Sequence, residues 1–258
     1  MITLIDISHA FWRNYFGSGS ATTAYELTID QCDFYHRECP RTVVCCEGRK
    51  PKRKEWFPEY KANRRPLPED AIDSLIGLGQ QVASWGVPVV AAEGYEADDV
   101  IATLVKQAWI EEVQILTNDK DLYALISPSV KLIGTKHVGV PECIAKFGVR
   151  PDQIRDLLAL VGDDSDNVPG CPHCGPGRAR DLLQKFGTLG AIKAATAAEL
   201  ETVRGVGKKT SEAIAAWDPT LAVKLVTLLD DAPVDLATLW ATPHEAPAPK
   251  PESEIPFS

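Results

Sequence analysis

The chain has 258 residues, and its 36 acidic side chains outnumber its 27 basic ones, which gives a formal net charge of −9 at pH 7. At this length it can bury a substantial core, as one large domain or as a domain with a smaller partner. No apolar run approaches the ~20 residues of a membrane span, and the first residues lack the basic start of a signal peptide. We therefore expect a cytoplasmic protein without membrane association, whose seven cysteines are reduced thiols.

Short β-rich runs alternate with longer stretches over residues 1–150. The runs predict strands at 2–7, 42–46, 87–91, 113–117 and 130–133. Apolar residues spaced three and four apart predict helices that include residues 75–85 and 101–108. This alternation is typical of an α/β domain with a mainly parallel sheet.

The strands stop after about residue 150, and residues 151–240 have the pattern of helices joined by glycine-rich turns. We expect an all-helical subdomain there. Residues 241–258 are rich in proline and acidic side chains, which predicts a disordered tail. The ending at 253–258 resembles the acidic Pro-Phe tips of bacterial single-stranded DNA-binding proteins, so binding of a replication or repair protein is one interpretation. A solubilising tail is the other.

Carboxylates gather in four short clusters, most of which directly follow a predicted strand or begin a helix. Parallel strands bring their carboxyl ends to one crevice, where so many like charges cost several kcal/mol unless cations neutralise them. Mg²⁺ or Mn²⁺ suits such oxygen ligands, and two ions about 3.5–4 Å apart promote in-line hydrolysis of a phosphodiester. The pattern predicts a metal-dependent nuclease, whereas the plain alternative is solvated surface acids. The carboxylates are Asp6, Glu96, Asp98, Asp99, Asp119, Asp121, Asp163 and Asp166.

A basic strip with interleaved aromatic side chains covers residues 49–65. Local charge is a better guide to nucleic-acid binding than net charge, because bound cations would offset the acidic clusters. The strip predicts phosphate contacts with stacking surfaces, and a solvated loop is the alternative. Its candidate DNA contacts are Arg49, Lys50, Lys52, Arg53, Lys54, Tyr60 and Arg65.

Two glycine-rich turns, near residues 170–179 and 203–210, each precede a predicted helix. Glycines allow close approach of the backbone, and the start of a helix favours a phosphate. The turns predict two grips on a DNA backbone that do not read bases. Taken alone, each turn is equally consistent with a tight helix connection. Their candidate residues are Gly170, Gly175, Gly177, Arg178, Gly205, Gly207, Lys208 and Lys209.

Four ordered motifs then resemble those of the 5′-nuclease superfamily. They are Tyr-Lys-Ala-Asn-Arg at 60–64, Glu-Ala-Asp-Asp-Val at 96–100, Asn-Asp-Lys-Asp-Leu at 118–122 and Leu-Val-Gly-Asp-Asp-Ser-Asp-Asn-Val-Pro-Gly at 160–170. The resemblance covers roughly residues 1–215. It is to the 5′-nuclease domain of bacterial DNA polymerase I and to free-standing bacterial and phage flap endonucleases.

The resemblance implies a Rossmann-like (PIN-like) sheet domain with a helical arch near 49–70, and then a helix–hairpin–helix (H3TH-type) subdomain that grips duplex DNA. It also implies two or more Mg²⁺ or Mn²⁺ ions, often a K⁺ ion at the hairpin, and cleavage of 5′ flaps or 5′ ends of branched or nicked DNA in replication or repair. Lys61 and Arg64 match arch residues that approach the scissile phosphate. By position, one metal site would use Asp6, Glu96 and Asp98, and the other Asp119, Asp121, Asp163 and Asp166, with Asp99 behind them.

One position departs from the family pattern. Counting back from Tyr60, the family's second-strand aspartate falls on Cys46, and Glu47 follows it. A neutral thiol is a poor Mg²⁺ ligand. Either Glu47 supplies the missing carboxylate, or the site is weakened and prefers Mn²⁺. Two rivals therefore stay open: a catalytically weakened branched-DNA-binding protein, and a ribonuclease with the same sheet and carboxylates.

The segment Cys171-Pro172-His173-Cys174 invites a zinc interpretation. No second nearby pair completes four ligands with convincing spacing, so we expect no zinc. Packing thiols are the favoured interpretation.

We expect the chain to be a monomer.

Overall fold

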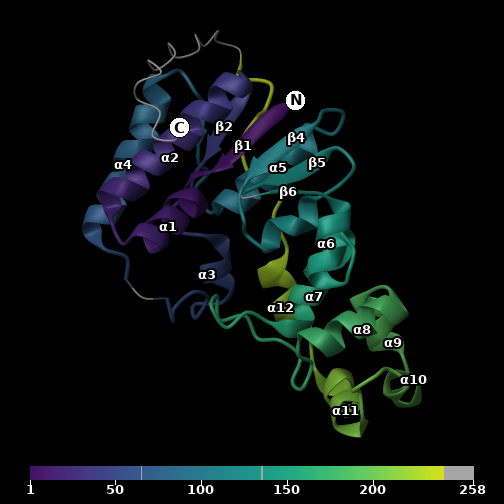
Figure 1. Ribbon diagram of the computed structural model, residues 1–258. Coiled ribbons are helices and arrows are strands. Elements are labelled where there is room, and N and C mark those ends of the chain that lie inside the picture. Colours follow the sequence, from purple (N-terminus) through teal and green to yellow (C-terminus); the bar gives the residue numbers. More distant parts are fainter. Residues whose placement is uncertain (65, 135, 241–258) are drawn as a thin grey trace.

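A six-stranded sheet forms the centre of the N-terminal part of the computed structural model, which describes residues 1–64, 66–134 and 136–240 (Figure 1). The strand order is β3-β2-β1-β4-β5-β6, and every neighbouring pair is parallel except β5 and β6. The strands are β1 (Ile2–Asp6), β2 (Thr42–Cys45), β3 (Val89–Val90), β4 (Val113–Leu116), β5 (Val130–Ile133) and β6 (His137–Val138).

The five predicted strands are present, with ends that differ by one or two residues. β3 is the shortest of them, because only two residues of the 87–91 run pair with β2. β6 was not predicted, since a two-residue antiparallel edge strand carries no apolar run that a pattern could detect. β1 is buried along its whole length, as expected for a central strand covered on both faces.

Helices cover both faces of the sheet (Figure 1). On one face, α1 (Ile7–Ser18), α2 (Ala21–Glu38) and α4 (Glu69–Ser84) pack with Ile5 of β1 around one apolar core. On the other face, α5 (Ala97–Gln107) packs with Leu4 around a second core that continues into the helical part. Successive residues of β1 thus point to opposite layers, and the sheet's carboxyl edge is left for polar side chains.

The helical part begins after α6 (Val140–Phe147) and lies at one end of the molecule (Figure 1). Its first helix, α7 (Ile154–Val161), packs against α12 (Thr220–Val226), which turns back towards the sheet. None of the helices in the described ranges is long and apolar enough to cross a membrane. The remaining elements are α3 (Lys52–Trp56), η1 (Asp121–Leu125), η2 (Pro151–Gln153), α8 (Pro176–Phe186), α9 (Leu189–Ala194), α10 (Ala197–Glu201) and α11 (Lys208–Ala216).

After α12, residues 227–236 run along α5 and are hydrogen-bonded to one of its faces. The accepting side chains are four residues apart, which places them in line on a helix. The expected helical subdomain of residues 151–240 therefore includes a segment fastened to the α/β domain. The bonds run from the N–H of Leu229 to Asp99 (2.8 Å), of Ala232 to Thr103 (3.0 Å) and of Leu236 to Gln107 (2.7 Å).

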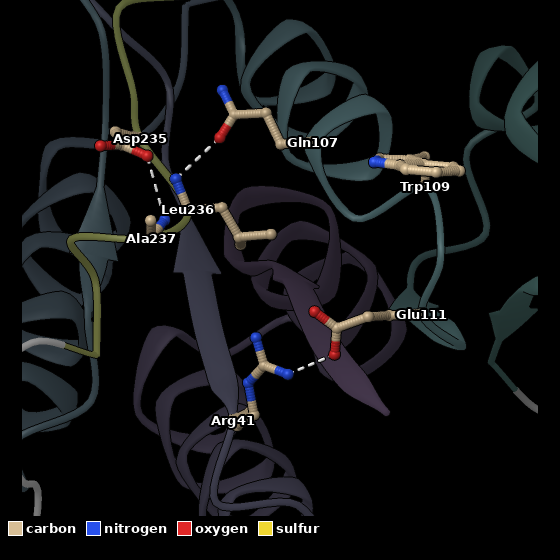
Figure 2. Close-up of a pocket in the computed structure, with 7 residues that line it drawn as sticks. All are labelled: Arg41, Gln107, Trp109, Glu111, Asp235, Leu236 and Ala237. Carbon is tan, nitrogen blue, oxygen red and sulfur yellow. Dashed lines mark hydrogen bonds and ion pairs between the residues drawn. The ribbon is translucent and has the colours of Figure 1, made fainter.

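A pocket of about 530 Å³ lies where this segment ends (Figure 2). An ion pair between Arg41 and Glu111 lines it, together with Trp109 and Gln107. Arg41 precedes β2 and Glu111 precedes β4, so the pocket lies at the amino edge of the sheet, opposite to the predicted carboxylate crevice. It is not part of the predicted catalytic site.

Gly48, just after β2, provides a test of this architecture. A Cβ added there would lie 1.8 Å from the carbonyl oxygen of Ala92, which is backbone and cannot swing away. We expect Gly48→Ala to lower the free energy of unfolding by about 2–3 kcal/mol, as overpacking does, in urea denaturation. Gly79→Ala is the control: Gly79 lies inside α4 with open space around it, and the substitution should stabilise by about 0.5–1 kcal/mol. Equal effects of the two substitutions would contradict the close crossing.

Candidate active site

Asp6 ends β1 and begins α1, so the strand–helix junction fixes its carboxylate at the carboxyl edge of the sheet. One oxygen accepts the N–H of His9 at 3.0 Å, and the other accepts the hydroxyl of Thr117 at 3.2 Å. Burial, and to a lesser extent the charges of Glu47 and Asp119, raise the pKa of Asp6 to about 7 in spite of these hydrogen bonds. Asp6 therefore lies in a setting that disfavours another negative charge.

The start of α5 contributes Glu96, its N-cap, and Asp98 in its first turn. Glu96 is buried, and its Oε2 accepts hydrogen bonds from Nη1 of Arg53 at 2.8 Å and from the hydroxyl of Tyr60 at 3.1 Å. Burial and then the neighbouring charge of Asp119 hold the pKa of Asp98 well above its ordinary value. The positive end of the helix dipole favours carboxylates at this position.

Asp119 and Asp121 follow β4. The carboxylate of Asp119 accepts the N–H of Asp121 at 2.9 Å, which holds the two side chains at one turn. Burial and then the charge of Asp119 raise the pKa of Asp121 to about 7. Among the described residues, Oδ1 of Asp121 is buried and has no hydrogen-bond partner. An orphaned carboxylate oxygen of this kind is suited to a cation.

Asp163 and Asp166 belong to a loop between α7 and α8. Residues 163 and 168 exchange two backbone hydrogen bonds, of 3.0 and 2.8 Å, which close the loop. Burial opposes the charge of Asp163, but hydrogen bonds from Lys120 and Ser165 outweigh it and hold its pKa below the ordinary value. Lys120 lies 2.8 Å from Asp163, a partner that the sequence motif contained but did not mark as functional.

The structure thus gathers the predicted carboxylates other than Asp99 at the carboxyl edge of the sheet, where the crevice is predicted, as two groups that share Asp119. Repulsion links the members of each group, since the charges of Asp119, Glu47, Glu96 and Asp6 raise the pKa of Asp98 and those of Asp119, Asp166 and Asp163 raise the pKa of Asp121. The first carboxylate group is Asp6, Glu47, Glu96, Asp98 and Asp119, and the second is Asp119, Asp121, Asp163 and Asp166.

The donor set fits a hard divalent cation, because it offers carboxylate oxygens whose repulsion a cation would relieve. Within the described part of the chain, no three His, Cys, Asp or Glu side chains converge closely enough to enclose an ion as they stand. Two of the carboxylates form ion pairs with basic side chains, Glu96 with Lys61 and Asp163 with Lys120. Metal binding would therefore require these ion pairs to rearrange.

Lys61 and Arg64 lie in the turns after α3, the five-residue helix within the segment expected to form the arch. The Nζ of Lys61 bonds Glu96 and lies 3.8 Å from Asp166, while Arg64 bonds Asp166 through Nε at 3.1 Å and also through Nη2. Lys61 has a φ of 57°, a strained value for a residue with a side chain, and its N–H donates to the carbonyl of Asp166 at 3.0 Å. The arch segment is thus bound directly to the 163–168 loop.

Cys46 follows β2, and burial raises the pKa of its thiol to about 12, so it is neutral at physiological pH. Glu47, the next residue, is accessible to solvent but reaches the crevice, where it accepts the N–H of Ala97 at 3.2 Å. Its charge raises the pKa of both Asp6 and Asp98. A carboxylate is therefore present beside the thiol that interrupts the family pattern.

The DNA contacts predicted for Arg53 and Tyr60 are wrong, and Asp99 is not a direct metal ligand. Arg53 is 3% exposed, and its five N–H donors bond Glu96, Asp99 twice, and the carbonyls at 225 and 227. Asp99 is fully buried, and Arg53 and two backbone N–H groups occupy both of its oxygens. Arg53 and the 4%-exposed Tyr60 therefore do not face DNA, and Asp99 does not face a metal.

The rest of the basic strip is more open. Arg49, Lys50 and Lys54 are exposed, whereas Lys52 lies over the ring of Tyr95 at 3.8 Å from its centroid. Arg65 lies outside the described residues. Composition alone could not separate the buried Arg53 from its exposed neighbours, because all of them are Arg or Lys with the same positive charge.

Arg178 joins the two glycine-rich turns. Its Nε donates to the carbonyl of Gly205 at 2.6 Å and its Nη1 to that of His173 at 3.0 Å. Gly175 and Gly207 cap α8 and α11. Gly170, by contrast, packs tightly, since an added Cβ would lie 2.4 Å from the Val161 backbone. The open positions in the turns are Gly175, Gly177, Gly207, Lys208 and Lys209.

Comparison of the chain with protein families identifies its relatives. Residues 1–148 match the family model described as 5′-3′ exonuclease, N-terminal resolvase-like domain, and residues 149–247 match 5′-3′ exonuclease, C-terminal SAM fold. The chain belongs to the 5′-3′ exonuclease family. The predicted superfamily and the predicted α/β domain followed by a helical subdomain are confirmed.

Curated relatives of this exonuclease family member include polymerases. DNA polymerase I of Rhizobium leguminosarum is 38% identical over 190 residues, 71% of this chain and 18% of that protein. The thermostable DNA polymerase I of Thermus thermophilus is 34% identical over 253 residues, 92% of this chain and 30% of that protein. A 5′-3′ exonuclease of Buchnera aphidicola is 38% identical over 152 residues, 57% of this chain and 50% of that protein. The chain thus spans half or less of the length of these relatives.

Solved structures show the same fold. T5 5′-exonuclease, solved with divalent metal ions (zinc) bound, superposes with a TM-score of 0.74 at 21% identity, over 88% of this chain and 89% of that one. The catalytic core of Rad2 in complex with a DNA substrate superposes with a TM-score of 0.59 at 17% identity, over 91% of this chain and 78% of that one. The fold is therefore one in which neighbours bind divalent metal ions and DNA.

Arg53 gives a prediction that separates a structural role from DNA contact. Arg53→Ala should lower the free energy of unfolding by about 3–5 kcal/mol, because it leaves the buried carboxylates of Asp99 and Glu96 without their partner. Lys54→Ala, on the same helix but exposed, should leave stability unchanged. Chemical denaturation measures both. Loss of DNA affinity in a fully stable Arg53→Ala variant would contradict the structural role.

Asp121 gives a prediction with a pH dependence. Its pKa of about 7 in the fold exceeds the ordinary value of 3.8, so its charge destabilises the fold fully above pH 7, and this penalty is lost as the pH falls towards 4. In EDTA, Asp121→Asn should therefore raise the free energy of unfolding by about 1–3 kcal/mol at pH 8 and by much less at pH 5. Thermal melts at the two pH values check this. Mg²⁺ should stabilise the wild type more than the variant.

Proposed function

We propose that this chain is a divalent-metal-dependent, structure-specific 5′-nuclease that removes 5′ flaps or 5′-terminal nucleotides from branched or nicked DNA in replication or repair. The observation that carries the proposal is a single crevice in which two carboxylate groups share Asp119 and are held together by Lys61, Arg64 and Lys120. Family membership supports the same chemistry. We infer a cytoplasmic monomer that uses Mg²⁺ or Mn²⁺, with K⁺ as a candidate ion at the α7–α8 hairpin.

The first and second carboxylate groups would hold the cations, one group for each. When bound, the ions would supply an activated water and neutralise the charge on the phosphodiester. Asp6 and Glu96 sit on backbone junctions that fix their positions, and the second group is carried by η1 and the closed 163–168 loop. The chain therefore presents its ligands from elements that need not refold.

Lys61 and Arg64 would serve the phosphate once the carboxylates are neutralised. In the described structure both pair with Glu96 or Asp166, which are members of the two carboxylate groups. Lys61 and Arg64, which lie in the arch segment, would be released from these pairs if Glu96 and Asp166 bound cations. Positive groups placed there stabilise charge that develops on a reacting phosphate.

The two glycine-rich turns would bind the duplex part of the DNA at a site separate from the carboxylates. Lys208 and Lys209 are exposed at the start of α11, and a Cβ added at Gly175, Gly177 or Gly207 would meet nothing within 4 Å. Arg178 is exposed but spans both turns, so its main role is to fix their separation. Such contacts position DNA without reading its sequence.

A catalytically weakened branched-DNA-binding protein is the second candidate, because Cys46 replaces a carboxylate. The placement of Glu47 favours an active enzyme, since its carboxylate lies within the first carboxylate group. A ribonuclease would share the carboxylates but gives no account of the two helical hairpins.

A labelled 5′-flap duplex tests the proposal directly. Cleavage should require Mg²⁺ or Mn²⁺ and stop in EDTA, and Asp98→Ala should abolish it while flap binding survives. Lys61→Ala and Arg64→Ala should each lower the single-turnover rate by on the order of 10²-fold with little change in affinity. Lys131→Ala, an exposed residue on β5, is the control and should be unaffected. Metal-independent cleavage, or an RNA strand cleaved in preference, would overturn the assignment.

Cys46 and Glu47 give a second prediction on the same assay. If Glu47 supplies the missing ligand, Glu47→Gln should reduce Mg²⁺-supported cleavage as strongly as Asp6→Asn, because each removes one anionic oxygen ligand. Cys46→Ser should then change cleavage little. A Mg²⁺ titration of each variant measures the effect. A large gain of activity in Cys46→Asp, with Glu47→Gln neutral, would show instead that the first metal site is weakened in this chain.

A further inference from the structure

Cys171 and Cys174 are the first and last residues of a tight turn that joins the 163–168 loop to α8. The N–H of Cys174 donates to the carbonyl of Cys171 at 3.1 Å, which is the bond of a β-turn. Pro172 holds the second position, and His173, with a φ of 61°, holds the third, as in a type II turn. A β-turn keeps its terminal Cα atoms within about 7 Å, and a disulfide needs about 4.4–6.8 Å. The backbone is therefore already in the range for a disulfide.

The two thiols differ in character. Both are free, and the Sγ of Cys171 donates to the carbonyl of Pro172 inside the turn at 3.7 Å. The influence of Cys174 and then that of Lys193 lower the pKa of the Cys171 thiol, whereas Cys171 and burial raise the pKa of Cys174. Cys171 is 5% exposed and Cys174 2%, but Pro172 and His173 between them are exposed. Both thiols are therefore buried beneath an exposed turn, and Cys171 is the more acidic of the two.

Anchors on both sides hold the turn in place. The N–H of Cys171 donates to the carbonyl of Leu160 at 2.9 Å, and Gly170 packs against the backbone of Val161. Gly175, directly after Cys174, caps α8. Closing the ring would thus shorten the distance between two sulfurs without moving either flank.

We propose that Cys171 and Cys174 form a dithiol–disulfide site that exchanges with low-molecular-weight disulfides such as oxidised glutathione. The Cys171 thiolate attacks one sulfur of the small disulfide, which breaks its S–S bond and releases one thiol. Cys174 then attacks the mixed disulfide at Cys171, so the protein S–S bond forms and a second small thiol leaves. Two protein thiols are oxidised, one small disulfide is reduced, and the two protons end on the released thiols.

The position of this site connects it to the DNA-binding turns. The carbonyl of His173, inside the turn, accepts Arg178, whose other contact is the carbonyl of Gly205 in the second turn. A disulfide across 171–174 fixes the carbonyl that Arg178 uses. We expect the oxidised form to melt at a higher temperature than the reduced form, because the link removes conformational freedom from the unfolded chain.

Peptide mapping of the full chain tests the site. After incubation with oxidised glutathione, unfolding and alkylation, the peptide containing residues 171–174 should have lost two hydrogens and carry no label, and dithiothreitol should restore labelling. Cys174→Ser should instead accumulate a glutathione adduct on Cys171, because the second attack is impossible. Cys143→Ser, which removes a buried thiol of the sheet domain, should form the 171–174 link normally.

Two results would overturn the proposal, and neither depends on a variant folding. One is full alkylation of both Cys171 and Cys174 in oxidised wild type, which would make them inert packing thiols. The other is a link between Cys32 and Cys46, whose thiols interact electrostatically across the sheet domain, without the 171–174 link. In the reduced native protein, Cys171 should react with iodoacetamide at least about tenfold faster than Cys174, because its thiol is the more acidic of the two.

Discussion

Repulsion among carboxylates at one edge of the sheet is the constraint on which the rest of this structure depends. Burial and neighbouring charge raise the pKa values of Asp6 and Asp121 to about 7, so the fold holds groups that resist ionisation. Such a cluster survives only if cations offset it. Without metal ions, Lys61, Arg64 and Lys120 do so from inside the chain. The same basic groups would be released when metal ions take over, which links metal binding to their availability for a phosphate.

A second arrangement makes the cluster possible by fixing α5. Arg53 uses all five of its donors on Glu96, Asp99 and the carbonyls at 225 and 227, so one guanidinium joins α3, α5 and the chain after α12. The segment 227–236 continues that connection along α5. The helical part therefore has a structural role in the α/β domain, because its returning chain helps set the helix that presents Glu96 and Asp98.

The arch segment and the 163–168 loop form a second joint between the two parts of the chain. Asn167 donates to the carbonyl of Glu59 at 2.9 Å, Asn63 donates to that of Asp164, and Lys61 and Arg64 share Asp166. Lys61 and Asn167 both have positive φ values, which is strain of the kind that functional sites retain. The first glycine-rich turn follows this loop directly, so the proposed metal ligands, the arch segment and the proposed duplex contacts are connected through a few residues.

Sequence by itself determined the fold class and the edge of the sheet that carries the acids. Apolar runs followed by Asp6, Asp119 and the Glu96 cluster predicted a mainly parallel α/β sheet, and parallel strands bring their carboxyl ends to one edge. It also indicated the helical region, since its glycine-rich turns are local. Only tertiary structure decided that Arg53 and Asp99 are buried, because both bond the segment 225–229, some 170 residues beyond Arg53 in the chain. Tyr60 is likewise buried through distant partners, Glu96 and Asp166. Likewise, no local pattern could show that Glu47 reaches the crevice beside Cys46, since that follows from where α5 begins against β2.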